Sequence, residues 1–396
     1  MTNRVNIQNI YLETPQVIKY KNILLIACAS ILPLYLSMFR YHLFGATIRI
    51  ADFVCLFAIF FTLIFFPKYF LKFIQFKFLP MWFLLAYIII QGIFLNNTAA
   101  SIKEAIQLLW VCTYLGIASV YAQWDSRKFY KWTLIFLALS AGYTILYHLS
   151  IGHISRYKLA SDGKYAFGLL SVLLLLKANN SNLKQDKLLL YLSLIPLLLS
   201  LERKGILGVF FIWFLLELIK IFKSKPTLKG IPIFLGGAFI LFIPSLLNEF
   251  GLFIDKQIYN SYSLDETVAL YTSNMHRESL LINSYQIIRD NLFFGVGADK
   301  IMEYMGQFYV HDNLRNGAHN FYVDTLVKYG VVGTSLLLCW PVLITFYHKV
   351  LHQLPTALIM FHIYCIFVIT FMADGQAVLI VFLFSFLNPY LFADYD

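Results

Sequence analysis

Three basic side chains stand out as residues that could carry out chemistry. Arg203 lies in the short connection Ser200-Leu-Glu-Arg-Lys-Gly205, Arg277 lies on the apolar stripe of an expected helix, and His319 directly precedes an apolar segment. A guanidinium group presents a planar fork of N–H donors that matches two phosphate oxygens. Near a helix N-terminus the dipole disfavours an imidazolium, so His319 is expected to be neutral, as a general base must be. These residue types indicate phosphate binding and acid–base chemistry.

Each of these residues also has a purely structural interpretation. Arg203 could extend to the lipid headgroups or pair with Glu202, next to it in the chain. Arg277 could pair with Glu278 or Asp265, although exposed ion pairs contribute little stability. A histidine such as His319 at a membrane surface is often only hydrogen-bonded. Arg156 and Lys158, in another polar segment, could add anion contacts or face lipid headgroups.

No metal site is expected. Several potential ligands accompany His319, but none has the spacing of a short helical metal motif; they are His276, His311, Asp299, Glu303 and Asp312. The five cysteines lie inside apolar runs without a Cys-x-x-Cys pair, so they are expected to be small buried apolar residues. We therefore expect a reaction that uses no metal and no cofactor.

The composition identifies the kind of protein that must position these residues. The chain has 396 residues, of which 60% are hydrophobic and 13% charged, with 38 phenylalanines. Its mean hydropathy is +0.70. A soluble domain is about 45–50% apolar and about 25% charged, and it could not hide such an excess inside one core. This excludes a soluble enzyme, a disordered chain and a disulfide-stapled secreted module, and it predicts a polytopic membrane protein.

The apolar windows predict an all-α fold with about 12 transmembrane helices, with about ten or eleven as alternatives. The windows at 165–177 and 188–201 are the shortest. The predicted spans are 22–39, 48–66, 78–95, 105–122, 130–149, 165–177, 188–201, 204–222, 230–247, 325–346, 354–372 and 375–393. The chain then divides into spans 1–9 over residues 1–247, a loop over 248–324, and spans 10–12 over 325–396.

Lysine and arginine orient these spans. With both termini in the cytoplasm, the cytoplasmic segments hold roughly twice as many of these residues as the short external loops, which is the bias that topology requires. The formal charge of +10 therefore needs no nucleic-acid partner. The loop 248–324 is placed outside, between spans 9 and 10. We expect it to contain a helix over 276–290, followed by a turn at Gly295 and Gly297 that leads back to the membrane.

Three stretches resemble the O-antigen ligase and polymerase family of bacterial envelope proteins. The first is Leu197-Leu-Leu-Ser-Leu-Glu-Arg203-Lys-Gly205-Ile-Leu-Gly, and the second runs from His276-Arg277 to Asn291-Leu-Phe-Phe-Gly295-Val-Gly297. The third is Gly317-Ala-His319-Asn320-Phe-Tyr-Val-Asp-Thr-Leu-Val-Lys-Tyr-Gly330-Val-Val-Gly333. Each motif is weak alone, but their order and their shared external side make the resemblance specific.

The resemblance implies a glycosyltransferase of the bacterial inner membrane that acts on the periplasmic side in lipopolysaccharide biosynthesis. A ligase would move a glycan from undecaprenyl diphosphate to a sugar hydroxyl of lipid A-core, whereas a polymerase of O-antigen or capsule would join lipid-linked repeat units. Carried over to this chain, Arg203 and Arg277 would bind the donor diphosphate and His319 would act on the acceptor hydroxyl. The reaction would invert the anomeric centre.

A transporter or flippase is the competing class. It would place polar groups near the middle of several spans and often has repeated halves. Here the predicted spans are almost free of ionisable groups, with His362 as the clearest exception. Transport is therefore the weaker interpretation.

Overall fold

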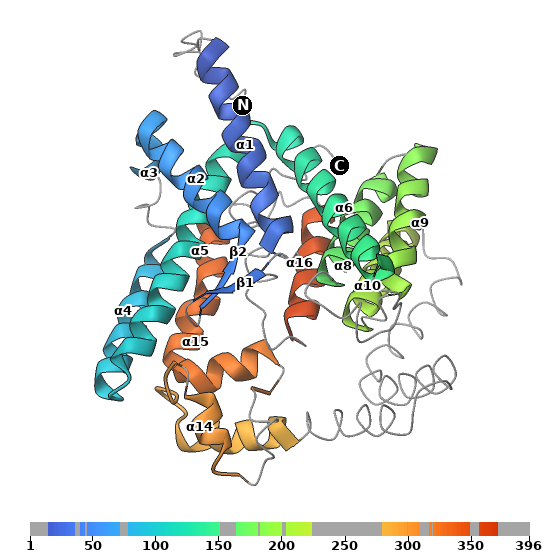
Figure 1. The fold of residues 1–396 in the computed structure, drawn as a ribbon. Coiled ribbons are helices and arrows are strands. Elements are labelled where there is room, and N and C mark those ends of the chain that lie inside the picture. The colour runs from blue at the N-terminus through green and yellow to red at the C-terminus, as the bar shows by residue number, and fades with distance from the viewer. Residues whose placement is uncertain are drawn as a thin grey trace, which may run out of the picture.

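The computed structural model describes residues 15–35, 40–43, 46–71, 78–150, 164–180, 183–199, 203–223, 279–298, 300–308, 317–318, 320–348 and 356–370. Helices dominate these segments, as the apolar composition predicts (Figure 1). The helices are α1 (Pro15–Tyr35), α2 (Ile50–Phe65), α3 (Lys68–Leu71), α4 (Leu79–Phe94), α5 (Thr98–Trp124), α6 (Ser126–Ser150), α8 (Lys164–Asn180), α9 (Lys184–Leu199), α10 (Arg203–Lys223), α14 (Ile301–Met305), α15 (Phe321–His348) and α16 (Thr356–Thr370).

One short hairpin departs from the all-helical expectation. Strands β1 (Arg40–Leu43) and β2 (Ala46–Arg49) pair antiparallel, with Arg40 opposite Arg49. They occupy the connection between α1 and α2, which the sequence analysis treated as a short external loop. Its β-branched residues Thr47 and Ile48 favour an extended backbone. The hairpin ends directly at α2, where the Asp52 carboxylate accepts the backbone N–H of Arg49 at 2.7 Å.

The helices form two neighbouring groups joined by α6 and α16. In one group, α1 packs on α2, α5 and α6, while α4 packs on α5 and on α15. In the other, α8 packs on α9, α10 and α16. Figure 1 shows α16 between α15 on one side and α8 with α10 on the other.

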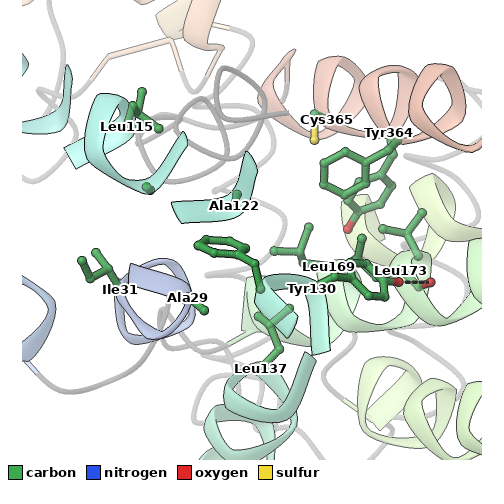
Figure 2. Packing of buried hydrophobic residues seen from close by; sticks show 14 of the residues in the cluster. Ala29, Ile31, Leu115, Ala122, Tyr130, Leu137, Leu169, Leu173, Tyr364 and Cys365 are labelled. Atoms are coloured by element: carbon green, nitrogen blue, oxygen red, sulfur yellow. Dashed lines mark hydrogen bonds between the residues drawn. The ribbon is translucent and has the colours of Figure 1, made fainter. Parts of the chain in front are cut away.

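A single hydrophobic core runs through both groups. It combines small residues at close helix contacts, such as Ala29 and Ala122, with large ones such as Leu137 and Leu169 (Figure 2). The Tyr130 hydroxyl donates to the Leu173 carbonyl oxygen at 3.0 Å, so a buried phenol is satisfied inside the core. This core links α1, α5, α6, α8 and α16 into one structure.

Part of the predicted membrane-spanning set is visible among the described residues. Three stretches are long and apolar enough to cross a membrane, namely Thr98–Trp124, Ser126–Tyr147 and Phe321–Trp340. Shorter apolar helices cover Ile50–Phe65, Leu79–Phe94, Ala166–Asn179 and Thr356–Val368. Many large apolar side chains point outward on these helices, including Phe60, Ile106 and Leu146, as expected of helices that face lipid. The total of about 12 spans stays a prediction, because 230–247 and 375–393 lie outside the described residues.

Candidate functional site

Most of the predicted site residues lie outside the described part of the chain. Arg203 is the first residue of α10, and its backbone but not its side chain is described. Arg277, His319, Arg156 and Lys158 lie outside the described residues. The structure does describe the helix that follows position 277 in the chain and the residues on either side of position 319.

The helix expected over 276–290, called the loop helix below, is described over residues 279–290. Its predicted apolar stripe is buried: Leu280, Ser284, Ile287 and Ile288 have almost no exposed surface, and the Ser284 hydroxyl donates to the Leu280 carbonyl oxygen at 2.8 Å. The first described residue of this helix, 279, lies two residues after Arg277 in the chain. The amphipathic interpretation of this segment is confirmed.

This helix belongs to a second, smaller hydrophobic cluster outside the main core. The cluster combines residues from the loop helix, from α14 and from the first half of α15, which Figure 1 shows grouped at one end of the molecule. Its buried members are Leu280, Ile287, Ile288, Val296, Ile301, Met305, Ala318, Val323 and Val327. The described parts of the second and third sequence motifs are therefore packed together.

Helix α15 is broken at Gly330, where φ is 61° and ψ is −169°. At the break, the carbonyl groups that precede it and the N–H groups that follow it lose their partners within the helix. The turn after the loop helix supplies new partners: the N–H groups of Val296 and Gly297 donate to the carbonyls of Val327 and Lys328 at 2.8 and 2.9 Å. In return, Val331 and Val332 donate to the carbonyls of Leu292 and Phe293 at 2.8 and 3.2 Å.

Two polar side chains of α4 complete this junction. The amide nitrogen of Gln91 donates to the Lys328 carbonyl oxygen at 2.8 Å and also to the Phe294 carbonyl oxygen. The Tyr87 hydroxyl lies 2.8 Å from the Phe294 carbonyl oxygen and 2.7 Å from that of Tyr329. Backbone groups without partners are costly at membrane depth, so these contacts stabilise an otherwise unfavourable helix break.

The start of α15 is held on both sides of position 319. The Asn320 side-chain oxygen accepts the N–H groups of Tyr322 and Val323 at 3.1 and 3.3 Å, as a helix N-cap does. On the other side, the buried Asp324 carboxylate accepts the Ala318 N–H at 2.7 Å. A Cβ on Gly317 would lie 2.5 Å from that carboxylate, so the backbone passes close to it. The residues that flank His319 are therefore tied to the first turn of α15.

Helix α16 connects the start of α10 with the start of α15. Tyr364 fits against Gly208, where an added Cβ would lie 2.8 Å from its ring. Helix α16 also packs against α15. The helix that begins at Arg203 and the helix that begins at Phe321 thus both contact α16.

A buried ionic cluster, which the sequence analysis did not identify, joins α5 to α15. The Lys328 ammonium lies 3.1 Å from Glu104 Oε1, and the Tyr329 hydroxyl donates to the same oxygen. Glu104 and Lys328 expose 14% and 30% of their side chains. The sequence contains only a weak sign that Glu104 is a partly buried partner, because an isolated acidic residue in the first turns of a helix usually faces solvent.

We expect Glu104→Gln to destabilise the protein by about 1–3 kcal/mol, because it removes the negative charge that lies 3.1 Å from the partly buried Lys328 ammonium. A double-mutant cycle with Lys328→Met, followed by thermal unfolding in detergent, measures the coupling. The matched control is the i,i+3 pair Lys220–Glu217, whose side chains are about half exposed at 2.7 Å separation. Equal coupling energies for both pairs would contradict a structural role for Glu104.

Metal binding is not tested by the structure. Among the described residues, no group of three His, Cys, Asp or Glu side chains is placed to hold an ion. The potential ligands His276, His311 and His319 lie outside that part of the chain.

The fold is that of a helical integral membrane protein in which a compact segment packs on a broken helix. Residues 188–338 match the model of the O-antigen ligase family. The resemblance carried by the three sequence motifs is thus confirmed for this part of the chain. The matched part contains most of α9, all of α10, the described residues from 279 to 308 and the first two thirds of α15. No curated protein matches the chain.

Proposed function

We propose that the protein is a membrane glycosyltransferase that moves a glycan from undecaprenyl diphosphate to a sugar hydroxyl of lipid A-core. The observation that carries the proposal is the family match, which spans Arg203, Arg277 and His319 in one continuous region. The coarser part, membrane glycan processing of the O-antigen ligase or polymerase type, is supported by that match. We propose, beyond that, the identity of the donor and the acceptor, the periplasmic location of the site and the roles of the three residues.

The arrangement of the described residues supports a shared site. Helix α10 starts at Arg203, and α16 packs against both α10 and α15. The loop helix, described from residue 279, packs against the first half of α15 through the second cluster. These contacts connect the helices nearest the three proposed positions, and they support the proposal of a shared site.

The proposed reaction is a direct displacement. The acceptor hydroxyl oxygen attacks the anomeric carbon, the bond from that carbon to the diphosphate oxygen breaks, and the hydroxyl proton passes to the His319 imidazole. The leaving diphosphate keeps the bonding electrons, and Arg203 and Arg277 neutralise its charge. Attack opposite the leaving group inverts the anomeric centre. No step requires a metal ion or a cofactor.

A gene deletion complemented with the wild-type protein tests the substrate assignment. If the deletion strain accumulates long glycans on the lipid carrier, and the wild type moves them to the core, the protein is a ligase. Single repeat units on the core that become ladders with the wild type identify a polymerase instead. Donor trapped on the cytoplasmic side identifies a transporter and contradicts the proposal.

We expect Arg203→Ala and Arg277→Ala to lower transfer by roughly 10²-fold or more, because each removes a charge-assisted contact to the leaving group. Replacement by lysine should restore part of the activity, since it keeps the charge but loses the planar fork. Arg289→Ala is the matched control, because Arg289 is largely exposed and pairs only with its neighbour Asp290 at 3.3 Å among the described residues. Wild-type transfer by both arginine variants would remove them from the site.

A further inference from the structure

The turn that follows the loop helix exposes three consecutive large apolar side chains. Leu292, Phe293 and Phe294 expose 43%, 65% and 65% of their surface. The backbone of this turn is well held, since the Gly295 N–H donates to the Asn291 carbonyl oxygen at 2.8 Å and the Asn291 amide to that of Ile287 at 3.0 Å. A rigid turn that presents such side chains to water would be unfavourable.

The hydrogen bonds of the turn place it beside the last turns of α4. The Phe294 carbonyl oxygen contacts Tyr87 and Gln91, which lie seven and three residues before the end of α4 at Phe94. The carbonyl of Ala298 instead contacts Asn97, in the polar connection between α4 and α5. Residue 298 therefore lies beside the connection between α4 and α5, whereas residue 294 lies beside the last turns of the apolar helix α4.

The surface around the turn is apolar at the same level. On α4, Ile90, Ile93 and Phe94 are all exposed, Phe94 by 81%. On α15, Val331 and Val332 follow the break and are also partly exposed. The turn carries no ionisable residue from 291 to 297, whereas Arg289 and Asp290, just before it, are both exposed. The apolar side chains of the turn thus continue the outward face of a membrane helix, with charges only at its edge.

We infer that residues 292–294 insert into the bilayer and contact lipid acyl chains, so that this external segment is anchored in the membrane. The occupant is the acyl region of the bilayer, because the patch is continuous with the outward apolar face of α4 and bears no charge. The inference does not depend on which glycan the protein transfers. It extends the expectation that the turn at Gly295 and Gly297 leads back to the membrane, since the part that begins at Leu292 reaches membrane depth about 30 residues before the predicted tenth span.

Depth-dependent quenching tests this inference on the full-length protein. In a Cys339→Ser parent, whose other four cysteines are buried, Phe293→Cys is labelled with an environment-sensitive fluorophore. The protein is reconstituted in phosphatidylcholine and phosphatidylglycerol vesicles that carry a nitroxide high on the acyl chain. Ile93→Cys on α4 serves as the lipid-facing reference and Asp290→Cys as the aqueous reference.

Insertion predicts that the label at 293 shows a blue-shifted emission, quenching by the nitroxide lipid equal to that at 93, and loss of quenching by aqueous iodide. Iodide quenching equal to that at 290 would overturn the inference. Protection from both quenchers would overturn it as well, because it would mean that protein covers the turn.

A charge substitution gives an independent readout. Phe293→Asp should sharply reduce the amount of folded protein in membranes, because a carboxylate would enter the acyl region. Met302→Asp is the matched control, since Met302 is similarly exposed on α14 beside the exposed Glu303. Equal accumulation of the two variants would contradict membrane insertion.

Discussion

Gly330→Ala is expected to destabilise the protein severely. A φ of 61° with ψ near 180° lies in a region that only glycine adopts readily, and forcing another residue into it costs about 1–3 kcal/mol. In addition, the new Cβ would lie 2.4 Å from the carbonyl carbon and oxygen of Phe293, which are backbone atoms that cannot rotate away. To relieve the overlap, the turn must separate from α15, and the backbone hydrogen bonds between them would then be lost.

Thermal unfolding of the purified protein in detergent measures this effect. We expect a drop of several degrees in the melting temperature, together with loss of transfer activity. Gly142→Ala is the matched control, because a Cβ at that position in α6 meets nothing within 4 Å. Alanine there should be neutral or stabilising by up to about 1 kcal/mol. A Gly330→Ala protein as stable as Gly142→Ala would refute the described packing of the turn against α15.

His319→Ala is expected to lower the rate of glycan transfer by about 10²–10⁴-fold, the usual contribution of a general base. Folding should be retained, because the contacts of Asn320, Asp324 and the Ala318 backbone that hold this segment are unchanged in the variant. The measurement is transfer by membranes that contain equal amounts of each variant, with the melting temperature as the check on folding.

Two further variants define what His319 does. Glutamine can orient a hydroxyl by hydrogen bonding but cannot take its proton, so activity of His319→Gln near that of the wild type would leave only an orienting role. Gln307→Ala, exposed on the same segment, should transfer at the wild-type rate. Full activity of His319→Ala would exclude the residue from the reaction.

The helical membrane fold could be predicted because its signal is local. Apolar runs of about 20 residues have few alternatives to a membrane helix, since every backbone polar group must be satisfied within the segment. The loop helix was predictable for the same kind of reason, because the spacing of Leu280, Ser284 and Ile287 places them on one face. The β1–β2 hairpin was not predicted, since a connection of this length gives little periodicity to interpret.

The sequence by itself thus determined the class of protein, the buried face of the loop helix, and the resemblance to the O-antigen ligase family, whose model matches residues 188–338. It did not reveal that the Gly295–Gly297 motif and the Gly330–Gly333 motif pack against each other, or that Gln91, Tyr87 and Glu104 hold them there. The physical reason is that a helix break leaves backbone groups whose partners can come from any part of the chain. Only the tertiary structure decides which distant segments supply them, and here the partners come from α4 and from the turn after the loop helix.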